Sequence, residues 1–111
     1  MNTISSQLDP LMAPLVKKLN TLGLVTRYSC QGNHGEADEP KIAYITFAPG
    51  IVLPYPVKAA ITERDWQLDH QDKDTYSVYA VPSDFSYDAL GLRNRNEDFI
   101  KGWWEIIYRS F

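Results

Sequence analysis

Two apolar runs enclose a polar stretch with two glycines, and this arrangement defines the local fold of the first half of the chain. The runs are residues 24–30 and residues 41–47. Both are rich in β-branched and aromatic residues, which favour strands. Residues 31–40 between them are polar and acidic, and they end at Pro40. Two strands joined by a polar loop predict an antiparallel pair.

A helix is predicted before this pair, over residues 10–22. Its apolar residues recur at helical spacing. Asp9 followed by Pro10 indicates the start, because a carboxylate caps free N–H groups and proline suits the first helical position. Gly23 is expected to end the helix. In the strand that follows, alternation predicts one face made by Val25, Arg27 and Ser29 and another made by Thr26, Tyr28 and Cys30.

The second half of the chain predicts a hairpin and a final helix. Residues 66–70 and 76–81 are strand-like and flank a polar turn. Residues 83–95 are expected to form an irregular loop. Asn96 is expected to cap the last helix, with Glu97 and Asp98 in its first turn. Residues 51–63 are ambiguous: Pro54 and Pro56 argue against a helix before them, but residues 57–62 are compatible with a short helix.

The predicted order is therefore α-β-β-(α)-β-β-α. This order indicates an α+β fold in which a small antiparallel sheet of about four strands carries the N- and C-terminal helices on one face. A length of 111 residues favours a single domain, residues 1–111.

The charge and the cysteine count exclude several classes of function. The net charge is -3 and the pI is about 5.2, which argues against a duplex nucleic-acid binder. No apolar run is long enough to span a membrane, so no membrane partner is expected. A single cysteine and the absence of a signal-peptide pattern at the N-terminus predict a cytoplasmic protein.

One hypothesis for the polar stretch is nucleophilic catalysis. Cys30 ends a predicted strand and opens a turn that contains Gly32, and His34 is near enough in sequence to act as its base. Backbone N–H groups in such a turn converge on anions and lower a thiol pKa. The alternative is a buried structural cysteine, because free cysteine is among the most buried residue types.

A metal site is a weaker hypothesis. Candidate ligands are Cys30, His34 and His70 with one of the acidic residues of the 31–40 loop, and zinc favours such ligands. Paired cysteine or histidine spacing is absent, so we expect neither a metal nor another cofactor.

Ligand binding is the leading hypothesis. The stretch offers hydrogen-bond donors, nearby aromatic residues offer flat apolar surfaces, and two arginines before the predicted last helix are suited to a phosphate or a carboxylate. We expect a nucleotide-like or other small polar or anionic ligand at the turn of residues 29–34, without turnover. The candidate binding residues are Arg27, Ser29, Gln31, Gly32, Asn33, His34, Tyr44, Trp66, Arg93 and Arg95.

A protein-interaction module is a third class of function. Trp103 and Trp104 are consecutive in the predicted last helix, about 100° apart, so both cannot face the core centre. Trp104 and the acidic loop are then candidates for a partner surface. A small open sheet also leaves edge strands to cover, so a homodimer is an alternative to a monomer.

Part of the sequence pattern resembles that of a protein family. Leu15, Leu19, Asn20, Gly23, Thr26, Ser29, Cys30, Gly32 and His34 resemble a group of small bacterial and phage proteins with a helix, a strand and a Ser-Cys-x-Gly-(x)-His turn. The resemblance covers about the first 47 residues, and here Asn33 is inserted between the glycine and the histidine. It implies a phage-type host-interaction or anti-defence role, such as sequestering a signalling nucleotide.

Overall fold

The computed structural model describes residues 10–33, 39–72, 75–86 and 88–111. Within these residues, three helices and four strands follow one another. They are α1 (Met12–Thr21), β1 (Thr26–Cys30), β2 (Tyr44–Phe47), α2 (Tyr55–Glu63), β3 (Gln67–Asp72), β4 (Thr75–Tyr79) and α3 (Ala89–Ser110).

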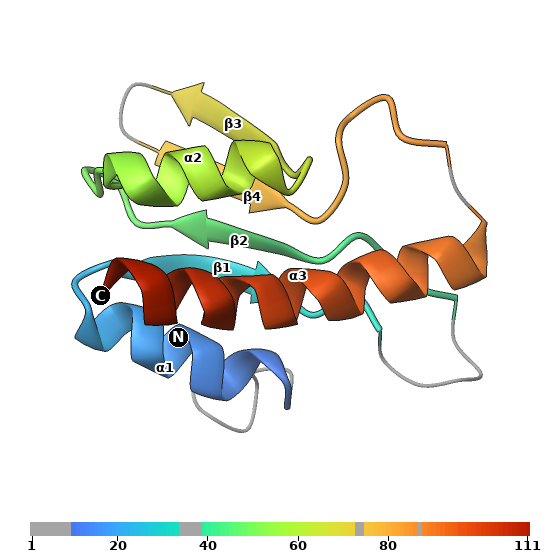
Figure 1. Cartoon of the computed structure of the whole chain (residues 1–111), viewed down its shortest axis with the longest axis horizontal. Coiled ribbons are helices and arrows are strands. Elements are labelled where there is room, and N and C mark those ends of the chain that lie inside the picture. Colours follow the sequence, from blue (N-terminus) through green and yellow to red (C-terminus); the bar gives the residue numbers. More distant parts are fainter. Residues whose placement is uncertain (1–9, 34–38, 73–74, 87) are drawn as a thin grey trace.

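The strands form one antiparallel sheet in the order β1-β2-β4-β3. Figure 1 shows the three helices on one face of this sheet. α1 contacts β1, α2 contacts β3, and α3 lies between the two and contacts both helices. The predicted α+β fold, with the N- and C-terminal helices on one face, is confirmed. The other face of the sheet carries no helix in the described part of the chain.

The core lies between the sheet and the helices. Trp103 of α3 is fully buried, and its ring centroid lies 6.0 Å from that of Phe47 on β2. Trp66 packs edge-on against Phe99, with 4.7 Å between the ring centroids. Ile45 belongs to the same buried cluster. Burying aromatic side chains of this size supplies much of the hydrophobic stabilisation.

α1 begins two residues later than predicted. The backbone N–H of Leu11, which precedes the helix, donates to Gln31 Oε1 at 2.9 Å. The predicted cap, Asp9, lies outside the described residues. At the other end, Gly23 has a φ of +87°, and the N–H of Leu24 returns to the carbonyl of Leu19 at 2.9 Å. This is a glycine-terminated helix end, as predicted.

The predicted alternation along β1 is only partly right. Thr26 pairs with Phe47 and Tyr28 with Thr46, so the register shifts at Arg27. A bulge of this kind inserts one extra residue and reverses the alternation on one side of it. Thr26 therefore shares the helix-covered face with Phe47, whereas Tyr28 stays on the open face.

The predicted start of the last helix is wrong. α3 begins at Ala89, and most of the supposed loop of residues 83–95 belongs to it. Asp88 is the N-cap, and its Oδ1 accepts the N–H of Gly91 at 2.7 Å. Asn96 lies seven residues into the helix and is buried. The apolar spacing from Leu92 to Phe99 continues the period of the helix and indicates the earlier start.

The remaining elements differ from prediction mainly at their ends. β2 begins at Tyr44, three residues later than expected, and the backbone groups of Lys41 and Ala43 bond to Gly32, Asn96 and Ala80. The short helix is present as α2, with Pro54 as its N-cap residue and Pro56 in the first turn, where an N–H is not needed. Trp66 precedes β3 instead of opening it. The middle of the β3–β4 turn lies outside the described residues.

Candidate functional site

The turn after β1 is bonded into the scaffold. The side chain of Gln31 is buried; its Oε1 accepts the N–H of Leu11, and its Nε2 donates to the carbonyl of Asn33. Asn33 Nδ2 donates to the carbonyl of Arg93 on α3 at 3.1 Å. Two of the predicted ligand-binding residues thus have their polar groups engaged within the protein.

Asn96 connects this turn to the sheet and is only 1% exposed. Its Nδ2 donates to Asn33 Oδ1 at 2.9 Å and to the carbonyl of Lys41 at 2.7 Å. Its Oδ1 accepts the N–H of Ala43 at 2.9 Å. Asn96 was predicted to cap a helix, and its role in joining the turn to the sheet was not predicted. A polar residue on the apolar stripe between Leu92 and Phe99 was the available signal.

Gly32 is required where the turn meets Asn96. Its φ is +83°, and a Cβ at this position would lie 2.3 Å from Asn96 Nδ2 and 2.4 Å from the carbonyl oxygen of Lys41. Its own carbonyl accepts the N–H of Lys41 at 2.9 Å. The glycine of the Ser-Cys-x-Gly turn therefore has a structural explanation. His34 lies outside the described residues.

Of the remaining predicted residues, Trp66, Arg27 and Arg95 are engaged elsewhere. Trp66 is a core residue, whereas Arg27 is exposed in the β1 bulge, 5.3 Å from the centroid of the Tyr28 ring. Arg95 Nη2 donates to the carbonyls of Asp65 and Ala80. Ser29 is half-buried opposite Ile45, on the helix-covered side, and Arg93 is half-buried on α3.

Trp66 and Arg95 do share a groove of about 350 Å³ beside α3. Its charges are mixed, because Arg64, Arg95 and Lys101 are accompanied by Asp98 and Glu105. Arg64 is already paired with Glu105, with 3.0 Å between nitrogen and oxygen. A groove with such compensated charge is a poor match to the phosphate or carboxylate expected at the arginines.

The open face of the sheet gathers a different set of side chains. Residues directly opposite one another in an antiparallel sheet lie on the same face. The register therefore places two rows across all four strands, one of Cys30, Tyr44, Tyr79 and Gln67, and one of Tyr28, Thr46, Ser77 and Asp69. Of these residues, only Cys30 and Tyr44 were among the predicted site residues.

The centre of the open face is closely packed although no described helix covers it. Ser77 is fully buried, and its Oγ lies 2.8 Å from Thr46 Oγ1 in a hydrogen bond. The rings of Tyr44 and Tyr79 are tilted against each other, with 6.0 Å between centroids. A satisfied polar pair next to a row of aromatic side chains makes this a preorganised surface.

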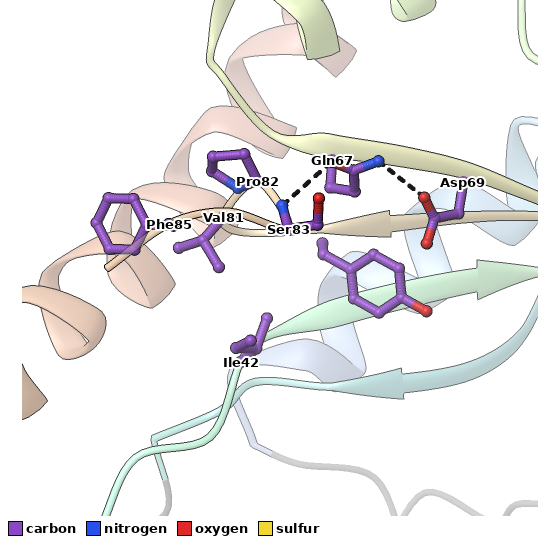
Figure 2. A pocket seen from close by; sticks show the side chains of 8 residues that line it. Ile42, Gln67, Asp69, Val81, Pro82, Ser83 and Phe85 are labelled. Carbon is purple, nitrogen blue, oxygen red and sulfur yellow. Dashed lines mark hydrogen bonds between the residues drawn. The ribbon is translucent and has the colours of Figure 1, made fainter. Parts of the chain in front are cut away.

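A pocket of about 310 Å³ lies at one end of this face. Figure 2 shows its side chains standing in front of the strands, with α3 behind the sheet. Gln67 Nε2 donates to Asp69 Oδ1 at 2.8 Å, and Gln67 Oε1 accepts the N–H of Ser83 at 3.2 Å. The lining residues are Ile42, Gln67, Asp69, Tyr79, Val81, Pro82, Ser83 and Phe85.

The chemistry of the pocket follows from this lining. Aliphatic and aromatic walls surround an amide, a carboxylate and two hydroxyl groups, and the lining contains no lysine or arginine from the described part of the chain. Cys30 is half-buried on the same row as Tyr79 but two strands away, which corresponds to about 10 Å at the usual strand spacing. The predicted nucleophile is therefore not a pocket residue.

Comparisons with known proteins do not identify the chain: no family model, no curated protein and no solved structure matches it. Among the described residues, no three of His, Cys, Asp and Glu gather as metal ligands would. Nor does any helix of the described part have the length and apolar character needed to cross a membrane.

Proposed function

We propose that this protein binds a small, flat, polar ligand in the pocket on the open sheet face, without turnover. The observation that carries the proposal is the combination of apolar walls with Gln67, Asp69 and Ser83, which are already ordered by mutual hydrogen bonds. Ligand sites in proteins combine mostly apolar lining with a few fixed polar groups in this way. Polar groups that are ordered beforehand lower the entropic cost of binding.

The lining favours a nucleobase or nucleoside over a phosphate group. Tyr79 and Phe85 supply flat surfaces for a planar ring. The Asp69 carboxylate accepts hydrogen bonds, so it complements ring or exocyclic N–H donors. It also repels a phosphate, and the described residues that line the pocket include no cation. Arg95 lies 5.4 Å from the centroid of the Phe85 ring, but its Nη2 is bonded to the carbonyls of Asp65 and Ala80. A volume of about 310 Å³ lies at the small end of ligand pockets, which run from roughly 300 to 1,000 Å³.

In this proposal the turn after β1 helps to position the pocket residues through hydrogen bonds. Asn96 holds the N–H of Ala43, and the carbonyl of Ala43 accepts the N–H of Ala80 at 2.9 Å. Ile42 and Val81, which line the pocket, are the neighbours of these two alanines. The Ser-Cys-x-Gly turn then positions pocket residues instead of contacting the ligand itself. An anti-defence role by sequestering a signalling nucleotide stays a prediction from the resemblance.

The test is calorimetric titration of the protein with a panel of nucleosides and their 5′-monophosphates. We expect at least one nucleoside to bind, and its monophosphate to bind no more tightly. Asp69→Asn should weaken binding about tenfold or more, because hydrogen bonds to charged groups contribute about 1.5–3 kcal/mol. Glu63→Gln, an exposed change of the same kind on α2, is the control. Absence of binding across the panel, or an unchanged Kd for Asp69→Asn, would refute the proposal.

A further inference from the structure

The end of the molecule that contains the C-terminus of α3 is unusually apolar at its surface. Figure 1 shows the ends of α1, β2 and α3 and the start of α2 meeting there, at the left of the view. Tyr55 is 80% exposed and Tyr108 83% exposed. Of the eight large hydrophobic side chains exposed in the described residues, five belong to these segments or their flanking loops: Val25, Val52, Tyr55, Tyr108 and Phe111.

A groove of about 340 Å³ runs between α1 and α3 at this end. Its walls are mostly aliphatic and aromatic, and one lysine also lines it. The lining residues are Lys18, Leu22, Trp104, Ile107, Tyr108 and Phe111. Trp104 is half-buried here, whereas Trp103 is in the core. The consecutive tryptophans therefore have different roles, Trp103 in the core and Trp104 at the groove.

The charge of this end is opposite to that of the whole chain. Residues 15–27, 47–60 and 106–111 contain five cations, Lys17, Lys18, Arg27, Lys58 and Arg109, and no Asp or Glu, although the net charge of the protein is -3. The nearest acid on α3, Glu105, is paired with Arg64.

We propose that this basic, apolar end is a docking surface for an acidic amphipathic segment of another protein. An apolar side chain of the segment occupies the groove beside Trp104, and its carboxylates face Lys17, Lys18 and Arg109. This is the helix-in-groove mode of recognition, with complementary charge steering the encounter. The surface is separate from the open-face pocket.

Two features of the end favour this occupant over others. A second copy of the chain in a two-fold dimer would place the same basic surface against itself, and like charges across an interface are unfavourable. A lipid surface requires protruding apolar residues and cations but not a groove between helices. The groove favours a partner with discrete apolar side chains.

The experiment is selection of a displayed library of random peptides on the immobilised protein. We expect the enriched peptides to carry an excess of Asp and Glu and large apolar residues at helical spacing. Fluorescence anisotropy should show that Tyr108→Ala and Lys18→Glu each weaken binding of the best peptide about tenfold or more. Truncation of an interface anchor typically has an effect of this size. Leu90→Ala, exposed at the other end of α3, and Lys41→Glu, exposed near the turn, are the matched controls.

Several outcomes would overturn the inference. They are no enrichment, enrichment of basic or uncharged peptides, or affinity unchanged by Tyr108→Ala and Lys18→Glu. Stronger binding of phosphatidylserine vesicles or of oligothymidine than of any selected peptide would assign the end to a membrane or a nucleic acid instead. Dimerisation that is lost in Tyr108→Ala would assign it to a second copy. Circular dichroism of each variant shows whether the fold is retained.

Discussion

Gly32 and Asn96 lie so close that a Cβ at residue 32 would be 2.3 Å from the side-chain nitrogen of Asn96. The first residue belongs to the turn after β1, and the second lies in the middle of α3. Their contact lets one buried amide serve Asn33, Lys41 and Ala43 together. The turn that was predicted to be a binding site is therefore a junction between the sheet and α3. It supports the strands that form the open face.

Replacing Gly32 with alanine should lower the free energy of unfolding by more than the conformational penalty alone. The residue has a φ of +83°, where a side chain costs about 1–2 kcal/mol. Displacing Asn96 or the Lys41 carbonyl adds an overpacking cost of about 1–3 kcal/mol. Urea unfolding measures the sum.

Gly23→Ala is the matched control for this substitution. Its φ is +87°, and no atom lies within 4 Å of the Cβ that it would gain. It should therefore lose only the conformational part. If both variants lost the same stability, the close approach between Gly32 and Asn96 would be wrong.

Asn96→Ala should destabilise the protein by at least about 2 kcal/mol. The substitution leaves the Ala43 N–H and the Lys41 carbonyl without the partner they have in the native protein, and each unsatisfied buried group costs about 1–3 kcal/mol. Asn94→Ala, an exposed change two residues away on α3, has the same effect on helix propensity. Chemical denaturation of the pair should separate them, and equal midpoints would contradict the role of Asn96.

The spacing of apolar residues and the residues typical of turns predicted the fold class, because both signals are local in the sequence. The apolar spacing of α1, the glycine at its end and the polar loop between β1 and β2 each act over a few residues. The β1 bulge was not predictable in this way, because Arg27 becomes the extra residue only through the pairing of Tyr28 with Thr46. Register depends on the partner strand, which one strand's sequence does not contain.

The candidate site was harder to predict because its residues come from distant segments. Gln67 and Tyr79 become neighbours of Tyr44 only through the strand order β1-β2-β4-β3. The polar residues of the turn after β1 were predicted to bind a ligand because they are close together in the sequence. Gln31 and Asn33 are polar for a different reason, since they satisfy backbone groups of other segments.

Asp88→Ala tests the early start of α3. Its Oδ1 accepts the N–H of Gly91 at 2.7 Å, and loss of such a cap typically costs about 1 kcal/mol. Amide exchange over the first turn of α3 should accelerate, and the urea midpoint should fall. Asp84→Ala removes an exposed carboxylate from the preceding loop and should leave both measurements unchanged. A helix that began at Asn96 would show no such difference.

Gly102→Ala tests whether Trp66 packs directly on α3. In an open helix interior this change stabilises by about 1 kcal/mol. Here the new Cβ would lie 2.6 Å and 2.8 Å from two carbons of the Trp66 ring, which is itself wedged against Phe99 and Trp103. We expect a net loss of about 1–2 kcal/mol from overpacking. The tryptophan emission of the folded protein should shift as the Trp66 ring moves.

Gly91→Ala is the control for Gly102→Ala on the same helix. Only Asp88 Oδ1, at 3.1 Å, would approach its new Cβ, so the gain in helix propensity of about 1 kcal/mol should offset most of the strain. Its emission spectrum should match that of the unsubstituted protein. A Gly102→Ala protein that was as stable as Gly91→Ala would mean that Trp66 does not rest on α3, and Trp66 would return to consideration as a ligand contact.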